Sequence, residues 1–540
     1  MKISDIRDLH VLNDTGNNAM DFAIFHNDVR NWRRSSVPSS LTIAFASLVA
    51  LILSAASVFG KCSADNVVVR KNNIVQANGM KMRYANWFNN YHESFVYKIF
   101  LKSKVNGQPF TTLEAVMDII HRVSDFTGGM HQIVYLVGWQ YEGHDSKYPS
   151  LDVVGDHCKS RFGESPLESL RGMMREARKF NADVSLHINV DDAYTNSPLW
   201  KLYVDDNLLC RDGDGKLIKS GMWDGEHAYY ISHQKEWKSG QLKRRILGLL
   251  NLIPEIRQSH TIHIDALFGH ESKLDGISRS DDMAAIASMV DFWHEQSIDV
   301  TTEFLPSMDE VGLFPMVYHH NTDECQRILY PPSLLCGGDS AWNTRHQLDF
   351  YNQKWESMRP SGGCAYEEAW GDGHWGDLTS AVLSAERRFL ANLFNRAILN
   401  AYYNRSRPTR HSVTPDEYVV ERQNGVTAMV FRKDRTLTVV DNGRTVVSNG
   451  DFFLDFPYGG GVILAYSEHG CNRAFRLPTS FASAKSLVMT VWPCGKTNNL
   501  DVSDGRVQLV LEKGTSALIR KLKSQNLNDI SKGETQCMTR

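Results

Sequence analysis

Two hydrophobic patterns alternate along the middle of this chain. Short runs rich in β-branched residues indicate buried strands, and longer runs with apolar residues every three or four positions indicate amphipathic helices. The strand-like runs are 132–137, 183–190, 261–265 and 299–303, and the helix-like runs are 167–180, 243–253 and 283–295. Strands that alternate with helices form parallel strand–helix–strand units. We therefore predict an α/β fold, a (β/α)8-type barrel over residues 81–410.

One predicted helix carries clear start signals. Ser165 fits the N-cap, Pro166 the first turn and Glu168 the capping-box position. These residues predict that a helix begins at Pro166.

Beyond about residue 415 the pattern changes to short alternating runs. Asn, Gly and Asp separate them, as in the turns of antiparallel sheets. The runs are 419–420, 426–431, 437–440, 446–447, 461–466, 487–491 and 506–512. They predict an antiparallel β-sandwich over residues 411–525, followed by a polar tail at 526–540. We expect this domain to shield the barrel rather than to bind carbohydrate.

The first 80 residues lie outside the predicted barrel. Residues 41–58 contain no charged side chain and follow Arg30, Arg33 and Arg34. A charged flank before an apolar run is typical of signal sequences and of signal anchors. We therefore expect an exported protein that is secreted, periplasmic or held at the cell surface, with membrane attachment through residues 41–58 as one alternative.

Composition and motifs argue against nucleic acid and nucleotides as ligands of this protein. The 540 residues are 42% hydrophobic, which suits a large core in two or three domains, and the formal net charge is −3. A nearly neutral chain is not expected to bind nucleic acid. No GxGxxG or P-loop motif is present, which argues against nucleotide chemistry.

The nine cysteines show neither a CxxC pair nor a Cys/His finger spacing. We therefore expect no metal and no cofactor. Cys471 and Cys494 could form a disulfide within the C-terminal region.

Two carboxylates give the strongest indication of function. Asp265 and Glu303 each close a predicted strand, and side chains at the carboxyl ends of barrel strands converge on the active site. A pair of acids there suits a glycosidase, in which one attacks the anomeric carbon and the other protonates the leaving oxygen. The alternative is that these acids cap helices or bind a cation.

Other polar and aromatic residues follow the same strands. Short polar side chains beside a tryptophan are suited to sugar hydroxyls and ring faces. Taken alone, His187 could be a core histidine and Trp223 a core tryptophan. The candidate substrate-binding residues are Trp139, His144, Asp145, His187, Asn189, Asp192, Trp223 and His263.

Five short motifs, in this order, resemble the catalytic barrel of the endo-α-N-acetylgalactosaminidases. They are GW…EGHDS within 138–146, NA…HIN…AY within 181–194, W…YYI within 223–231, ID at 264–265 and TE at 302–303. These bacterial enzymes release Gal-β1,3-GalNAc from Ser or Thr of mucin-type glycoproteins. A related, smaller family of α-N-acetylgalactosaminidases shares the barrel.

The resemblance implies a role for each matching residue. Asp265 would be the nucleophile and Glu303 the acid/base, with Asp145 holding substrate hydroxyls and Trp223 in the loop that closes over the sugar. The family retains configuration through a glycosyl-enzyme, which implies carboxyls about 5–5.5 Å apart. The expected substrate is therefore α-linked N-acetylgalactosamine of mucin-type O-glycans.

Two alternatives stay open at this point. Family members are usually far longer, and Asp191-Asp192 stands where other residues are expected. An exo-acting, α-galactosidase-like enzyme on another α-linked sugar is one alternative. A catalytically silent barrel that binds glycans is the other.

Overall fold

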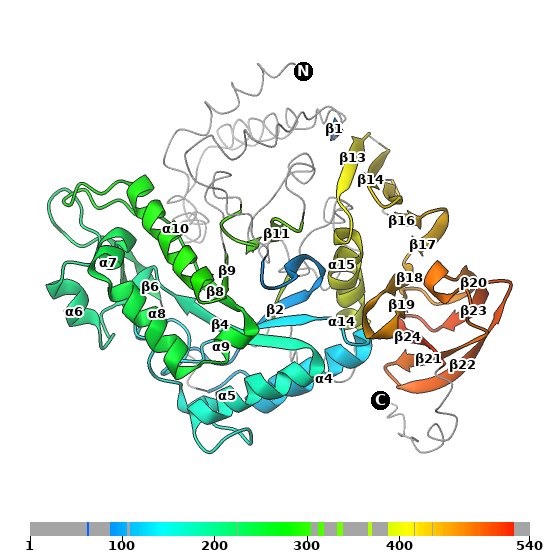
Figure 1. Cartoon of the computed structure of the whole chain (residues 1–540), viewed down its shortest axis with the longest axis horizontal. Coiled ribbons are helices and arrows are strands. Elements are labelled where there is room, and N and C mark those ends of the chain that lie inside the picture. The colour runs from blue at the N-terminus through cyan, green and yellow to red at the C-terminus, as the bar shows by residue number, and fades with distance from the viewer. Residues whose placement is uncertain are drawn as a thin grey trace, which may run out of the picture. The chain divides into compact units, whose positions relative to one another are not determined.

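The computed structural model describes residues 62–63, 87–104, 108–223, 225–303, 312–317, 332–337, 366–369, 387–414, 416–431, 433–434 and 436–522 (Figure 1). These residues lie in one compact unit that spans Lys61–Arg540. The apolar run 41–58 falls outside the described ranges, so its role in export stays a prediction. Within those ranges, no helix has the length and apolar character needed to cross a membrane.

A parallel sheet of eight strands carries the strand ends of interest. Its strands are β2 (Phe95–Phe100), β3 (Gln132–Val137), β4 (Ala182–Asn189), β8 (Thr261–Asp265), β9 (Asp299–Thr302), β10 (Met316–Val317), β11 (Cys336–Gly337) and β12 (Tyr366–Ala369). From β2 to β11 each strand of this sheet pairs in parallel with the next, and β12 pairs in parallel with β2. This is the strand order of a barrel. A closed barrel would also require β11 to pair with β12, and this pairing is not among the described contacts. The described strands therefore form a parallel half-barrel sheet.

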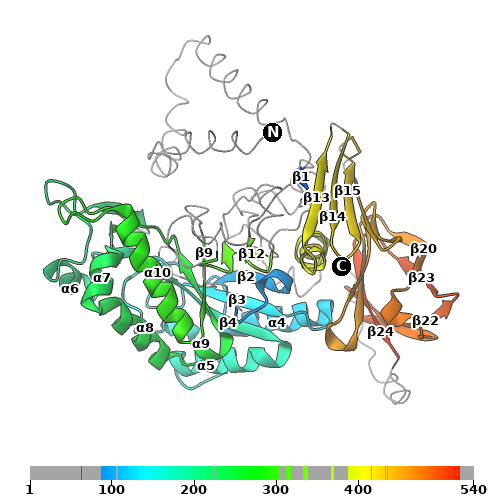
Figure 2. The same ribbon diagram turned by 45° about the horizontal axis from the view of Figure 1, so that its top comes forward.

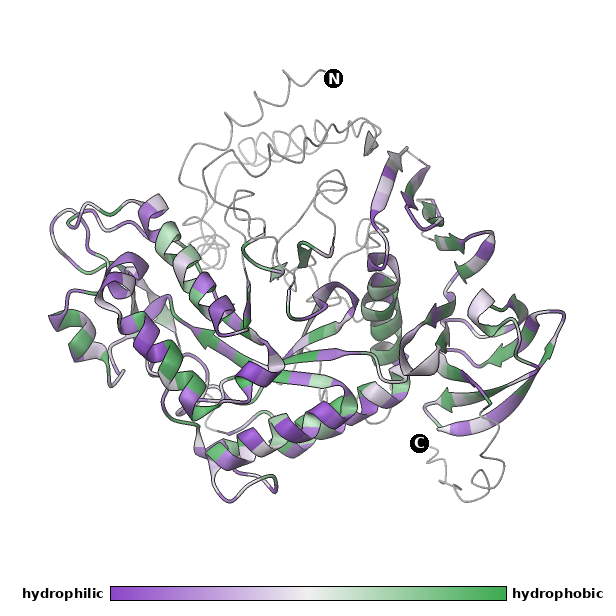
Figure 3. Cartoon of the chain, viewed as in Figure 1, coloured by the Kyte–Doolittle hydropathy of each residue, from purple (hydrophilic) through white to green (hydrophobic). Residues whose placement is uncertain are grey.

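Helices cover this sheet, as expected for parallel strands buried on both faces (Figures 1 and 2). The α-helices within the described residues are α4 (Leu113–Thr127), α5 (Pro166–Ala177), α6 (Trp200–Asp205), α7 (His233–Ser239), α8 (Gln241–Leu252), α9 (Ile256–Ser259), α10 (Arg279–Glu295), α14 (Arg387–Asn392) and α15 (Leu399–Asn404), with a π-helix at Leu393–Ile398 between the last two. Of these, α5, α9 and α10 pack directly on strands of this sheet. Hydrophobic and hydrophilic residues alternate along α4 and α5 (Figure 3), and the apolar ones, such as Val116 and Leu170, are buried.

The capping signals are confirmed. α5 begins at Pro166, and the Ser165 hydroxyl accepts a hydrogen bond from the Glu168 N–H. The helix ends at Ala177, earlier than the predicted residue 180, because the chain tightens into a 3-10 turn at Arg178–Phe180. α10 begins earlier than predicted because Ser278 and Asp281 form a capping box.

A small antiparallel sheet is inserted between β4 and β8. It comprises β5 (Asp192–Tyr194), β6 (Lys219–Trp223) and β7 (Glu226–Tyr230). The resemblance implied a loop at Trp223, but Trp223 pairs with Glu226 at the end of a hairpin. Asp-Gly at 224–225 is a favoured hairpin-turn pair. Trp223 is therefore presented by a paired strand.

The C-terminal region is antiparallel, as predicted, but it forms one continuous sheet. Its strands are β1 (Cys62–Ser63), β13 (Pro408–Val413), β14 (Glu417–Arg422), β15 (Val426–Phe431), β16 (Thr436–Asp441), β17 (Arg444–Ser448), β18 (Asp451–Phe456), β19 (Val462–Ser467), β20 (Cys471–Arg476), β21 (Ser486–Trp492), β22 (Lys496–Ser503), β23 (Arg506–Leu511) and β24 (Thr515–Lys521). The sheet folds over itself, so that Phe453 of β18 stacks on Phe475 of β20 at 4.6 Å between ring centroids. A sandwich-like core therefore arises without two separate sheets.

The disulfide considered for Cys471 and Cys494 is not formed. Both thiols are free. Cys471 lies on β20, which pairs with β23, whereas Cys494 lies in the turn between β21 and β22. The strand order therefore does not bring the two cysteines together.

The turn after β3 requires a glycine. Gly138 has φ +72°, and a Cβ atom there would lie 2.0 Å from the Lys102 carbonyl oxygen. The same carbonyl accepts the His144 N–H at 2.8 Å. This close approach fixes the loop that carries the candidate residues at 144 and 145.

We expect Gly138→Ala to destabilise the protein by more than the ~1–2 kcal/mol of a positive φ alone, because the methyl group also meets the Lys102 carbonyl. Urea denaturation would measure the loss. Gly129→Ala is the control, since Gly129 also has a positive φ but nothing within 4 Å of its Cβ position. Equal losses in the two variants would contradict the steric argument.

Candidate active site

Asp265 and Glu303 meet at the carboxyl edge of the parallel sheet. Asp265 is the last residue of β8 and Glu303 follows β9 directly, and Ile264 pairs with Thr302 across these neighbouring strands. The Glu303 carboxyl forms a hydrogen bond with that of Asp265. Both side chains are 15% exposed. The register of the two strands therefore brings the two predicted acids together in a partly enclosed site.

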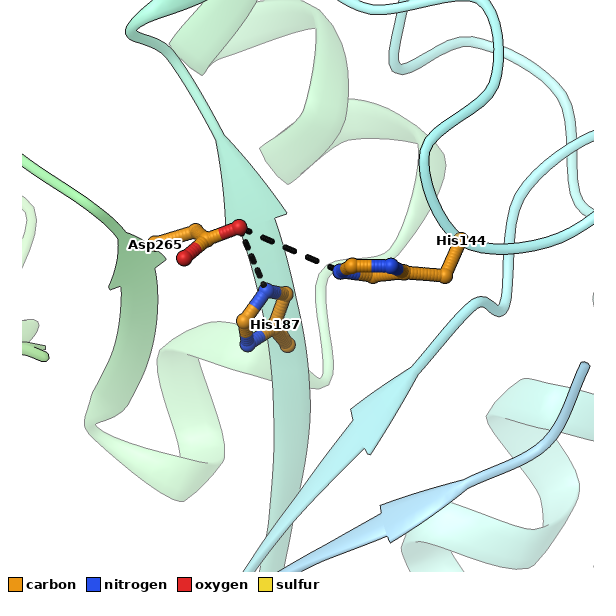
Figure 4. Close-up of side chains that lie close together, drawn as sticks. All are labelled: His144, His187 and Asp265. Atoms are coloured by element: carbon orange, nitrogen blue, oxygen red, sulfur yellow. Dashed lines mark ion pairs between the residues drawn. The ribbon is translucent and has the colours of Figure 1, made fainter. Parts of the chain in front are cut away.

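Two histidines face the Asp265 carboxylate (Figure 4). Its Oδ2 atom lies 3.4 Å from His187 Nε2 and 3.9 Å from His144 Nε2. His187 belongs to β4 and His144 to the loop after β3, so three successive strand ends contribute to one cluster. Burial raises the pKa of Asp265, and the positive charges of His144 and Lys98 oppose that rise.

The two histidines differ in charge. Burial and the nearby Lys98 ammonium hold the pKa of His187 well below its ordinary value, so His187 is neutral. Burial also disfavours a charge on His144, but Asp145 and Asp265 outweigh it and raise its pKa to about 9. His144 Nδ1 lies 3.0 Å from Asp145, which also accepts a 3.0 Å hydrogen bond from the Tyr194 hydroxyl.

Lys98 is a site residue that the sequence analysis did not identify. It lies in the middle of β2, is almost fully buried, and forms an ion pair with Glu303. A buried lysine requires a partner of opposite charge. The charged residue inside the apolar run Phe95–Phe100 was the signal that could have revealed it.

Asn189 and Asp192 lie together at the end of β4. The Asn189 amide donates to Asp192 Oδ2 at 2.9 Å, and its oxygen accepts the N–H groups of Asp191 and Asp192. Burial and the neighbouring Asp191 raise the pKa of Asp192 to about 7. Asn189 thus holds the turn that carries both acids.

Of the remaining candidate substrate-binding residues, two lie in the core and one lies at the surface. Trp139 is fully buried and donates its indole N–H to the His187 carbonyl at 3.1 Å, which argues against contact with a sugar. His263 is also buried, and its Nδ1 atom lies 2.8 Å from Thr301 Oγ1. Trp223 is 44% exposed and accessible to a ligand.

A second buried cluster lies in the loops beside the site, and sequence reasoning missed it. His233 lies between two carboxylates, 2.8 Å from Asp282 and 3.4 Å from Asp191. Asp191 also contacts His270 Nε2 at 2.8 Å, and Asp282 accepts the His270 N–H. The cluster therefore joins the loops after β4 and β8 to the start of α10. The adjacent acids Asp191 and Asp192 were the signal in the sequence.

Two residue groups have the atom types and spacing of metal ligands. They are His144, His187 and Asp265, and His187, His263 and Glu303, with ligand atoms within 4.8 Å of one another in each group. The Lys98 ammonium forms an ion pair with Glu303 of the second group. This positive charge opposes the binding of a cation at Glu303.

Comparison with known proteins supports a glycosidase. Residues 77–324 match the sequence model of the endo-α-N-acetylgalactosaminidase family. The match includes His144, His187, Asp265 and Glu303. The resemblance seen in the short motifs is thus confirmed over these residues.

Similar solved structures include glycosidases. An α-N-acetylgalactosaminidase of Bifidobacterium bifidum, solved as a quadruple mutant, aligns with 13% identity and a TM-score of 0.47, over 64% of this chain and 57% of that chain. The same enzyme in complex with GalNAc aligns with a TM-score of 0.46. This chain therefore spans less than two thirds of the length of that enzyme. An α-amylase of Geobacillus thermoleovorans aligns with 9% identity and a TM-score of 0.43, over 81% of this chain and all of that chain.

We expect Asp145→Asn to lower the pKa of His144 from about 9 towards its ordinary 6.5, because Asp145 is the main group that raises it. A folded-state pKa above the ordinary value stabilises the fold below pH 6.5, and this contribution is lost as the pH rises through about 9. The variant should therefore lose more stability at pH 6 than at pH 9.5. An NMR titration of His144, combined with urea denaturation at both pH values, would measure these effects.

Asp183→Asn is the matched control, since Asp183 pairs with His131 at 2.9 Å, outside the site. It should leave the His144 titration unchanged. A His144 pKa that stays near 9 in Asp145→Asn would show that Asp145 does not set it.

Proposed function

We propose that this protein is a retaining glycoside hydrolase that acts on α-linked N-acetylgalactosamine of mucin-type O-glycans. It would release Gal-β1,3-GalNAc or GalNAc from Ser or Thr. The family match over residues 77–324 supports the α-GalNAc specificity. The observation that carries the proposal is the hydrogen-bonded contact of Asp265 with Glu303 at adjacent strand ends inside that match.

The close approach of the two acids is compatible with retention of configuration. Retaining enzymes hold their two carboxyls about 5–5.5 Å apart, whereas inverting enzymes need about 6.5–9.5 Å to admit a water molecule. The hydrogen-bond interaction of Glu303 with Asp265 is compatible with the shorter separation.

In the first step, Asp265 attacks the anomeric carbon while the bond to the Ser or Thr oxygen breaks. Glu303 gives its proton to that oxygen, and Lys98 then neutralises the Glu303 carboxylate through their ion pair. In the second step, Glu303 takes a proton from water, whose oxygen attacks the same carbon and releases Asp265.

Charged and aromatic groups around the pair would hold the sugar. The protonated His144 and its partner Asp145 supply a donor and an acceptor for hydroxyl groups, and Trp223 supplies an exposed ring face. We further propose that β11 and β12 close the parallel sheet into a barrel. Export through residues 41–58 completes the proposal, since mucin-type glycans are extracellular.

We expect Asp265→Ala to be nearly inert on all α-glycosides, because without a nucleophile neither step proceeds. Glu303→Ala should still form the glycosyl-enzyme from a nitrophenyl glycoside, whose leaving group needs no proton, and should then stall. Added azide should rescue this variant and yield an α-glycosyl azide. Burst kinetics and NMR of the product with Gal-β1,3-GalNAc-α-nitrophenol would measure both effects.

Asp125→Ala is the control, because Asp125 is a partly exposed acid on α4. Its activity should equal that of the unmodified protein. A β-azide from Glu303→Ala, or full activity in both site variants, would overturn the assigned roles. Released disaccharide indicates endo action, released monosaccharide indicates exo action, and the absence of turnover on any aryl α-glycoside indicates a glycan-binding barrel.

A further inference from the structure

The hairpin that carries Trp223 contacts a distant part of the carboxyl edge of the sheet. It is inserted between β4 and β8 in the sequence, yet Glu226 of β7 forms an ion pair with Lys104, in the segment that follows β2. Ser103, the residue before Lys104, pairs with His144 of the candidate site. Because Trp223 pairs with Glu226 across the hairpin, these contacts connect Trp223 to the rim of that site.

The Trp223 indole lies against a residue that has no side chain. Gly221 precedes Trp223 by two positions on β6, so the two residues face the same side of the strand. A Cβ atom at Gly221 would lie 2.7 Å from Trp223 Cε2, 2.8 Å from its Cζ2 and 2.9 Å from its Nε1. Carbon atoms that are not bonded attract each other best at about 3.5–4.0 Å, so these contacts would be repulsive. A side chain at position 221 would therefore displace the indole.

The backbone itself does not require glycine at this position. Gly221 is not among the residues with a positive φ, so an alanine could adopt its conformation. Glycine weakens the interior of a strand, and where it occurs it often marks the close approach of another group. Here the group that approaches is the Trp223 indole, which gives Gly221 a role in placing that ring.

The end of the hairpin is anchored, while the indole stays open to a ligand. Trp223 is 44% exposed although it contacts Gly221. The side chains of Lys104 and Glu226 are only 29% and 26% exposed, and the Asn196 side chain also forms a hydrogen bond with Glu226. A partly shielded pair with a second partner constrains geometry better than an isolated surface pair does.

We propose that Gly221 is a positioning residue for Trp223. It lets the indole lie against β6 in one orientation, while the ion pair of Lys104 with Glu226 anchors the hairpin to the segment after β2. The ring is then in place before a substrate binds, which lowers the entropy lost on binding. The inference rests on the proposed function in one respect, the contact of Trp223 with a sugar.

The orientation of the indole can be measured without turnover. The chain has 12 tryptophans, and after labelling with fluorotryptophan the 19F NMR signal that is missing from Trp223→Phe belongs to Trp223. We expect one sharp signal. In Gly221→Ala this signal should move, because an exposed ring can turn away from the new methyl group while the strand stays in place. Gly213→Ala is the matched control, since nothing lies within 4 Å of its Cβ position.

The ion pair is tested with the same signal. Lys104→Met should shift or broaden the Trp223 signal, because the hairpin loses its anchor. The double variant Lys104→Glu with Glu226→Lys exchanges the two charges and should restore the original signal. Lys201→Met is the control, because Lys201 forms an ion pair with Asp205 on α6, outside the hairpin. A Trp223 signal that is the same in Lys104→Met as in the control would overturn the role of the ion pair.

The expected consequence for catalysis is weaker binding of the substrate. Gly221→Ala should raise KM for Gal-β1,3-GalNAc-α-nitrophenol roughly fivefold and leave kcat within about twofold, because a sugar that rests on the indole does so in both the ground state and the transition state. A merely structural role would instead reduce the amount of folded enzyme, so that kcat falls and KM is unchanged. Gly213→Ala should alter neither constant.

The proposal can fail separately from the proposed function. An unchanged Trp223 signal in a folded Gly221→Ala would overturn it. So would several signals, or one broadened by exchange, for Trp223 in the unmodified protein, even if Gly221→Ala did not fold. A signal that moves in Gly221→Ala, in a protein that hydrolyses no glycoside, would support the control of Trp223 by Gly221 and overturn only the hydrolase assignment.

Discussion

The site depends on one electrostatic constraint: two carboxyl groups must lie in contact while they are largely removed from water. The pairing of Ile264 with Thr302 brings Asp265 and Glu303 to this position. Two carboxylates in contact at a site with little water require a shared proton or positively charged partners. Lys98 and a protonated His144 provide the positive charge. β2 and the loop after β3 must therefore be in place before the pair is stable.

The loops that hold these groups are fixed by buried contacts. The turn after β3 is held by the close approach of Gly138 to the Lys102 carbonyl. The loops after β4 and β8 are joined by His233, which lies between Asp191 and Asp282. Such a network stays stable only while every member keeps its partner. Rigid loops are what a site needs when it positions charged groups within a few ångströms.

Two histidines in the same site differ in charge, and their neighbours determine the charge of each. His144 lies between two carboxylates and is positively charged. His187 is buried beside Lys98 and His144 and is neutral. One residue type can therefore act as a cation or as a neutral ring according to its nearest partners.

The sequence by itself determined the local elements. Residues 132–137 and 261–265 are strands as predicted, Pro166 begins a helix, and the C-terminal region is antiparallel. These follow from periodicity and capping, which act over a few residues. The positions of Asp265 and Glu303 at the ends of two predicted strands also identified them as a candidate pair.

The tertiary structure decided which distant residues complete the site. Lys98 pairs with a residue 205 positions away, Trp139 lies in the core, and the sandwich arises from a single sheet. Charge pairing and burial are non-local, because they depend on which strands become neighbours, and no short stretch of sequence contains that information.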